Sequence, residues 1–179
     1  MKFRVKDLTR IAIFAALCAV CAWISIPLSA PLVPFTLQTF AVFLACLVLG
    51  GGKAAISLVV YLLLGLVGAP VFTGFRGGPS VLLGPTGGYI VGFPVVCLVY
   101  LLITHFWKGK LAKPVALVVG LVVLYLFGTT WYVIGYVGSG TMTFLLALTK
   151  CVFPFIIPDL LKMALAFFIA SRLPARVRD

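Results

Sequence analysis

Hydrophobic residues occupy long runs of this chain, and short segments rich in glycine, proline or basic residues separate the runs. A helix needs about 20 apolar residues to cross the hydrocarbon core of a bilayer. The pattern therefore predicts six transmembrane helices, at approximately residues 8–26, 36–50, 54–67, 87–104, 115–133 and 155–171. We expect them to form a single membrane domain over residues 1–179, so the predicted fold is that of an all-α integral membrane protein.

Composition supports this class, because 64% of the residues are hydrophobic and only 9% are charged. The net charge of +11 is also typical of proteins that bind nucleic acid. Here, however, the basic residues flank the apolar runs and do not form a patch. We therefore expect membrane lipid around the protein and no nucleic-acid partner.

The basic residues are distributed unequally over the predicted tails and loops. Eleven Lys or Arg residues fall on one side, whereas the segments of the other side contain only Arg76 and Lys150. Cytoplasmic loops of membrane proteins carry an excess of Lys and Arg. We therefore expect both termini in the cytoplasm, and residues 27–37, 68–88 and 133–153 on the outer side.

Residues 68–88, here called the Gly-rich segment, contain seven Gly and three Pro, too many for a continuous helix. The segment is also apolar. Irregular backbone at membrane depth is tolerated only where it is buried in protein or lines a cavity. We therefore expect the segment to dip into the bundle and cover an outward-facing ligand pocket. Arg76, near its middle, is either part of that pocket or a cation that reaches the membrane interface.

The last apolar region, residues 142–170, is too long for one straight span. Pro154 and Pro158 lie where a break would resolve the excess. We expect a short segment over 142–153 and a spanning helix that begins at Pro158. Asp159 would then lie in the first turn, where the helix dipole favours an acid. Discontinuous helices of this kind form the binding sites of many transporters.

Asp159 and Lys162 are three positions apart in this apolar region, so they share one helix face. Ionisable groups at membrane depth are costly and survive only when they are paired or functional. One interpretation is a structural ion pair, and the other is a polar ligand site. For a ligand site, the carboxylate, the cations and the aromatic residues predict a small, partly apolar, anionic ligand with an amide-like head group.

The first predicted span carries small residues at helical spacing. Ala12 with Ala16, and Ala15 with Ala19, are four positions apart, which lets a second helix approach closely. The second helix belongs either to this chain or to a partner.

Four stretches resemble a known family: VPFTLQTFAVFLACLVLG at 33–50, YLLLGLVGAPVF at 61–72, LLGPTGGYIVGF at 82–93 and PFIIPDLLKMALA at 154–166. Their order and spacing are similar to those of the BioY family, the biotin-specific S components of energy-coupling factor (ECF) transporters. The resemblance implies a six-helix protein of the cytoplasmic membrane that captures biotin from outside with high affinity. It also implies a transmembrane T component and two cytosolic ATPases as partners. Ala12, Ala16 and Ala19 match the face that family members use against the T component.

The resemblance also implies roles for residues of the polar pair. Asp159 would accept hydrogen bonds from the N–H groups of the biotin ureido ring. Lys162 would donate to the ureido carbonyl or hold Asp159 in place. Tyr89 would pack on the apolar rings and chain of biotin.

Other candidate substrate-binding residues are less closely defined. Arg76 or Lys150 would bind the biotin carboxylate, and Gln38 and Thr86 are further candidates. We expect no cofactor and no metal, with biotin as the transported ligand. The chain has no G-x-x-x-x-G-K-[ST] motif, so ATP hydrolysis is expected of a partner and not of this chain.

Three alternative functions remain open from the sequence. The first is an S component for a different vitamin. The second is an intramembrane enzyme that uses Asp159 and Lys162 as acid and base. The third is a structural subunit that uses its alanine faces and binds no ligand, although this leaves the apolar Gly-rich segment unexplained.

Overall fold

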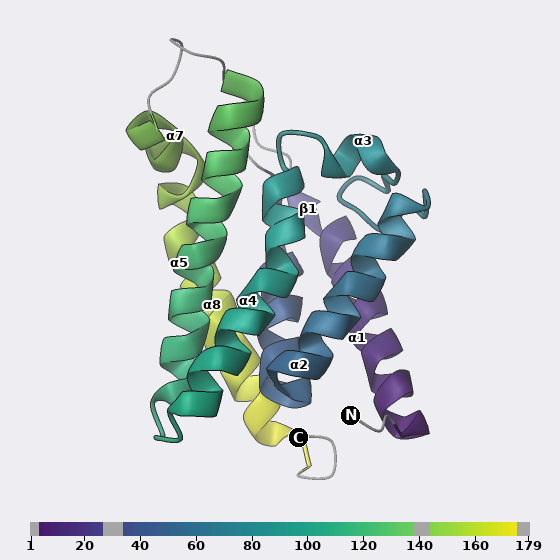
Figure 1. Cartoon of the computed structure of the whole chain (residues 1–179), viewed down its shortest axis with the longest axis vertical. Helices are drawn as coiled ribbons and strands as arrows, with labels where there is room; N and C mark the ends of the chain where they lie inside the picture. Colours follow the sequence, from purple (N-terminus) through teal and green to yellow (C-terminus); the bar gives the residue numbers. More distant parts are fainter. Residues whose placement is uncertain (1–3, 27–33, 138–143, 175–179) are drawn as a thin grey trace.

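The computed structural model describes residues 4–26, 34–137 and 144–174, apart from the side chain of Lys150, and these form a helical bundle (Figure 1). In chain order the elements are α1 (Val5–Trp23), β1 (Ser25–Ile26), β2 (Phe35–Thr36), α2 (Gln38–Leu66), α3 (Pro79–Leu82), α4 (Gly87–Phe106), α5 (Ala112–Tyr132), the π-helical turn η1 (Val133–Val137), α7 (Phe144–Cys151) and α8 (Phe153–Arg172). The apolar runs therefore fold as helices, as predicted. Among the described residues, four helical stretches are long and apolar enough to cross a membrane: Gln38–Leu66, Gly87–Phe106, Ala112–Tyr136 and Phe153–Arg172.

Helix α2 reverses direction at Gly50, where φ is 70° and ψ is 160°. Only glycine adopts such a conformation at little cost. The start of α2 follows β2, which pairs with β1 at the end of α1. Beyond the reversal, Lys53 forms a 2.9 Å ion pair with Asp7 at the start of α1. The sequence predicted two separate helices at 36–50 and 54–67, and α2 does comprise two antiparallel segments that meet at Gly50.

Helix α1 is not among the four most apolar stretches, because Lys6, Asp7 and Arg10 lie in its first six positions. It ends at Trp23, three residues before the predicted boundary at residue 26. The chain then forms β1, which pairs antiparallel with β2, so Ser25 lies opposite Thr36. The prediction of a plain loop before the second span was therefore wrong at residues 35–36. The start of α1 and the end of α8 lie at the same end of the bundle (Figure 1).

The break in the last apolar region lies at Val152 and not at Pro158. Val152 has φ −122° and ψ −52°, and it separates α7 from α8. Pro154 occupies the first turn of α8, where its missing N–H costs nothing. Pro158 lies inside α8 and has no N–H to donate to the carbonyl of Pro154, an exposed residue near the start of the helix. The prediction that Asp159 lies in the first helical turn was therefore wrong.

The Gly-rich segment contains the short helix α3 and is anchored in the bundle by Phe72. This side chain is 0% exposed. Its ring fits against Gly65 of α2, where a Cβ atom would lie only 2.0 Å from the Cζ of Phe72. The Phe72 N–H donates to the carbonyl of Arg76 at 2.9 Å, and the Gly78 N–H donates to the carbonyl of Gly65 at 2.7 Å. These contacts attach the segment to the end of α2.

We expect Gly65→Ala to destabilise the protein by about 1–3 kcal/mol, because the new methyl group overpacks the buried Phe72 ring. Thermal unfolding of the detergent-solubilised protein measures the effect. Gly135→Ala is the matched control, since a Cβ atom at position 135 meets nothing within 4 Å. Equal melting temperatures for the two variants would contradict the predicted packing of Phe72 against Gly65.

Candidate functional site

A cavity lies between α2, α4, α5 and α8, and we call it the site cavity. It encloses about 580 Å³ of space free of protein atoms, part of which opens to solvent. The residues that line it are Pro34, Thr36, Gln38, Thr39, Thr73, Thr86, Tyr89, Ile90, Phe93, Leu124, Tyr125, Cys151, Phe155, Asp159 and Lys162. The lining therefore combines aromatic and aliphatic side chains with a few polar groups, as small-molecule sites commonly do.

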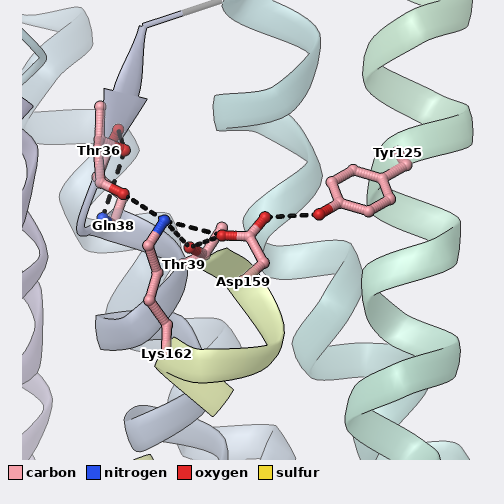
Figure 2. Close-up of polar contacts among 6 residues, drawn as sticks. All are labelled: Thr36, Gln38, Thr39, Tyr125, Asp159 and Lys162. Carbon is pink, nitrogen blue, oxygen red and sulfur yellow. Dashed lines mark hydrogen bonds and ion pairs between the residues drawn. The ribbon is translucent and has the colours of Figure 1, made fainter. Parts of the chain in front are cut away.

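Asp159 is 3% exposed and accepts hydrogen bonds from three other helical positions (Figure 2). Its Oδ1 accepts from the Thr39 hydroxyl and from the Lys162 ammonium, each at 2.8 Å. Its Oδ2 accepts from the Tyr125 hydroxyl at 2.6 Å. These donors come from α2, α8 and α5, so the carboxylate joins three helices.

Lys162 is 6% exposed, and its ammonium group has an acceptor for each of its three donor positions. Nζ donates to Asp159 Oδ1 at 2.8 Å, to the carbonyl of Thr36 at 2.7 Å and to the Thr39 hydroxyl at 3.2 Å. The Phe35 ring lies 4.0 Å from the same atom, close enough for a cation–π contact. Lys162 is therefore fully occupied by groups of the protein.

Asp159 and Lys162 differ in how many hydrogen-bonding positions remain free for a ligand. An ionised carboxylate offers about four lone-pair positions. Asp159 uses three of them in the bonds above, so it has acceptor capacity to spare. Lys162 has no such spare donor. Of the two roles considered for Lys162, the geometry favours that of holding Asp159 in place.

Gln38 and Tyr89 add further polar groups at the cavity wall. The Gln38 side-chain amide donates to the Tyr61 hydroxyl at 2.7 Å and accepts from the hydroxyl of Thr36 at 3.1 Å. The Tyr89 hydroxyl shares a 3.0 Å hydrogen bond with Thr129 of α5. The ring of Tyr89 lies against the backbone of α5 at a glycine, so aromatic surface faces the cavity at this wall.

Five of the residues predicted from the sequence line the site cavity: Asp159, Lys162, Tyr89, Thr86 and Gln38. Arg76 is exposed and is not among the lining residues. Lys150 lies on α7, but its side chain falls outside the described residues. The structure therefore gives no cation within the described lining other than Lys162.

The small residues of α1 do not share one exposed face. Ala12 and Ala16 are exposed. Ala19 is only 6% exposed and packs, with Ala15, in the core of the bundle. A partner helix would therefore find Ala12 and Ala16 accessible, whereas Ala19 is already used within the chain.

Two side chains that donate to the Asp159 carboxylate were missed by the analysis of the sequence, those of Thr39 and Tyr125. Thr39 is next to Gln38, and Tyr125 is a hydroxyl-bearing residue inside an apolar run. A buried tyrosine hydroxyl usually needs a hydrogen-bond partner, so its position at membrane depth was the available signal. Which partner it would find depends on the packing of α5 against α8, and this is not readable from local sequence.

The model of the BioY family matches residues 1–179. The chain belongs to the BioY family. One BioY relative, the probable biotin transporter BioY of Pyrococcus horikoshii, is 42% identical over 170 residues, which covers 95% of this chain and 97% of that protein. The biotin transporter BioY of Thermotoga maritima is 39% identical over 168 residues, covering 94% and 95%.

A solved structure extends the likeness from sequence to fold. The crystal structure of the S component for biotin from an ECF-type ABC transporter aligns with a TM-score of 0.81 at 26% identity. The alignment covers 94% of this chain and 90% of the other. The BioY relatives and the long apolar helices together identify the chain as a multi-pass membrane protein.

Breaking the polar pair on one side should destabilise the protein, because it leaves a buried carboxylate without its cation. We expect Lys162→Met to cost about 3–5 kcal/mol of the free energy of unfolding. The double variant Asp159→Asn/Lys162→Met, which carries no charge at the site, should recover most of this loss. Unfolding of the ligand-free protein in detergent measures both. A Lys162→Met variant as stable as the wild type would contradict the assignment of a buried ion pair.

Proposed function

We propose that the chain binds biotin in the site cavity and takes part in its uptake as the substrate-binding S component of an ECF transporter. The observation that carries this proposal is Asp159, a buried carboxylate with spare acceptor capacity at the wall of a mostly apolar cavity. The biotin-transporter names of its relatives support the same ligand. So does the structural similarity to a biotin S component.

The chemistry of biotin suits the described lining of the cavity. Its ureido ring has two N–H donors, and Asp159 supplies an acceptor that Tyr125 and Lys162 hold in place. Its thioether ring and hydrocarbon chain are apolar and would pack on Tyr89 and Phe93. Thr86 offers a hydroxyl group that can donate to a carboxylate or to a carbonyl, whereas the Thr73 hydroxyl donates to Gln38 and can accept from a ligand.

The membrane arrangement is part of the same proposal. The six spans are α1, the two segments of α2, α4, α5 and α8, with the start of α1 and the end of α8 in the cytoplasm. The concentration of Lys and Arg at that end of the bundle supports this orientation. The Gly-rich segment would then lie at the outer mouth of the site cavity. Energy would come from a T component and two ATPases, and the exposed Ala12 and Ala16 are the proposed contact with the T component.

Two of the alternatives differ in how well they are supported. An S component for another vitamin would keep the same fold, so competition binding with a panel of vitamins separates the two ligands. An enzyme is disfavoured, because the family and its fold are those of transporters. Within the described residues, no three His, Cys, Asp or Glu side chains are grouped to hold a metal.

Asp159→Asn should weaken biotin binding by more than about tenfold, or ~1.4 kcal/mol, because one carboxylate oxygen becomes an amide donor facing the ureido N–H groups. The variant should also lose stability, because the buried Lys162 ammonium is left without its anion and keeps only hydrogen bonds. Its folding is therefore verified at the temperature of the titration. Isothermal titration of the purified protein in detergent measures the affinity. An unchanged dissociation constant in a folded variant would remove Asp159 from the proposed binding contacts.

Arg76→Ala provides the matched control, because Arg76 is exposed and lies outside the lining of the cavity. We expect its affinity for biotin to stay within about twofold of the wild type. A large loss would instead assign the biotin carboxylate to Arg76, as first considered from the sequence.

A further inference from the structure

Tyr61 is a fully buried tyrosine behind the wall of the site cavity. It does not line the cavity, but its hydroxyl bonds Gln38, which does. The side chain is 0% exposed and sits in the second segment of α2. Its hydroxyl accepts a 2.7 Å hydrogen bond from Gln38 Nε2 and donates at 3.2 Å to the carbonyl of Val71. Tyr61 therefore connects the cavity wall to the Gly-rich segment.

These bonds fix which way the Gln38 amide points. A tyrosine hydroxyl has a single proton, and the Val71 carbonyl can only accept, so the hydroxyl must donate to Val71. It must then accept from Gln38, which places the NH₂ group of the amide toward Tyr61. The amide oxygen in turn accepts from the hydroxyl groups of Thr36 and Thr73, at 3.1 and 3.4 Å.

The same network reaches both the charged pair and the anchor of the Gly-rich segment. On one side, the carbonyl of Thr36 accepts from Lys162 at 2.7 Å. On the other side, the Tyr61 ring makes an edge contact with the buried ring of Phe72, with centroids 5.4 Å apart. The contacts therefore connect Lys162 to the Gly-rich segment. They pass through Thr36, Gln38 and Tyr61 in turn.

We infer that Tyr61 is a positioning residue for the binding site: it orients the Gln38 amide at the cavity wall and couples occupancy of the cavity to the anchoring of residues 71–78. Tyr61 itself does not touch the ligand. The inference rests on the proposed function, because biotin is the ligand used to test it. A ligand that settles against Gln38 and Thr73 restrains the amide, and through Tyr61 it restrains the carbonyl of Val71.

Tyr61→Phe removes the hydroxyl and keeps the ring that packs on Phe72. We expect the dissociation rate of biotin to rise by about tenfold, because the Gln38 amide loses its fixed orientation and residues 71–78 lose their link to it. Stopped-flow binding to the purified protein in detergent measures this rate. The control is Tyr100→Phe, which removes a hydroxyl from another buried tyrosine, one on α4 outside the cavity lining.

Tryptic cleavage after Arg76 reports on the second half of the inference. Arg76 is exposed and is the only Lys or Arg between Lys53 and Lys108, so cleavage there gives identifiable fragments. Biotin should slow this cleavage in the wild type and in Tyr100→Phe, and much less in Tyr61→Phe. A Tyr61→Phe variant that merely melts earlier, with the wild-type dissociation rate and full protection by biotin, would overturn the inference.

Two further measurements keep the test decisive. The double variant Gln38→Leu/Tyr61→Phe should release biotin at the same rate as Gln38→Leu alone, because each substitution removes the same Gln38–Tyr61 hydrogen bond. Additive effects on the dissociation rate would count against this bond as the connection. If Tyr61→Phe does not fold, amide hydrogen exchange of the wild type serves instead. Biotin should then protect the amides of Phe72 and Gly78, and unchanged exchange would overturn the coupling.

The failure of this inference can be told apart from failure of the proposed function. A folded wild-type protein that does not bind biotin overturns the proposed function and this inference with it. A wild-type protein that binds biotin, together with a Tyr61→Phe variant that behaves as Tyr100→Phe does, overturns this inference alone.

Discussion

Burying Asp159 and Lys162 in a membrane protein is the constraint on which the rest of the site depends. Taking either charge out of water costs several kcal/mol unless hydrogen bonds and an opposite charge offset it. Thr39 meets this requirement for both charges, because its single hydroxyl donates to Asp159 and accepts from Lys162. The carbonyl of Thr36 and the hydroxyl of Tyr125 complete the set. The pair therefore requires that α2, α5 and α8 stay in register around it.

Glycine residues at two contacts between helices allow the helices to pack closely enough to form the site. A Cβ atom at Gly51 would lie 2.6 Å from the carbonyl oxygen of Cys97, so the reversal in α2 can approach α4 only with glycine there. A Cβ atom at Gly128 would lie 2.3 Å from the Tyr89 ring, so Tyr89 reaches the cavity only because α5 is bare at that position. In lipid, such close packing replaces the hydrophobic driving force that assembles soluble bundles. The glycines thus bring together the helices that the charged pair then fixes.

The sequence predicted the helices and the pairing of Asp159 with Lys162, because both depend on local signals. Long apolar runs identify the helices, and an acid and a base three positions apart within such a run identify the pair. The start of α8 was mispredicted because two prolines compete for the same role, and only the packing shows that Pro154 takes the first turn. Tyr125 and Thr39 were missed because they lie 34 and 120 positions from Asp159 along the chain. Their role arises from tertiary contacts that no local pattern contains.

The unequal state of the two charges also bears on selectivity. Because the protein itself occupies every donor of Lys162, the pair offers a ligand an acceptor at Asp159 and no free cation. A ligand with N–H groups satisfies that acceptor, whereas one that presents only oxygen atoms meets a carboxylate it cannot bond. Sites built to hydrogen-bond a substrate group reject analogues that lack it by factors of roughly 10⁴–10⁵, far beyond what apolar packing achieves. In the proposed binding site, Lys162 would therefore contribute to selectivity because it holds the acceptor in place and offers the ligand no free donor.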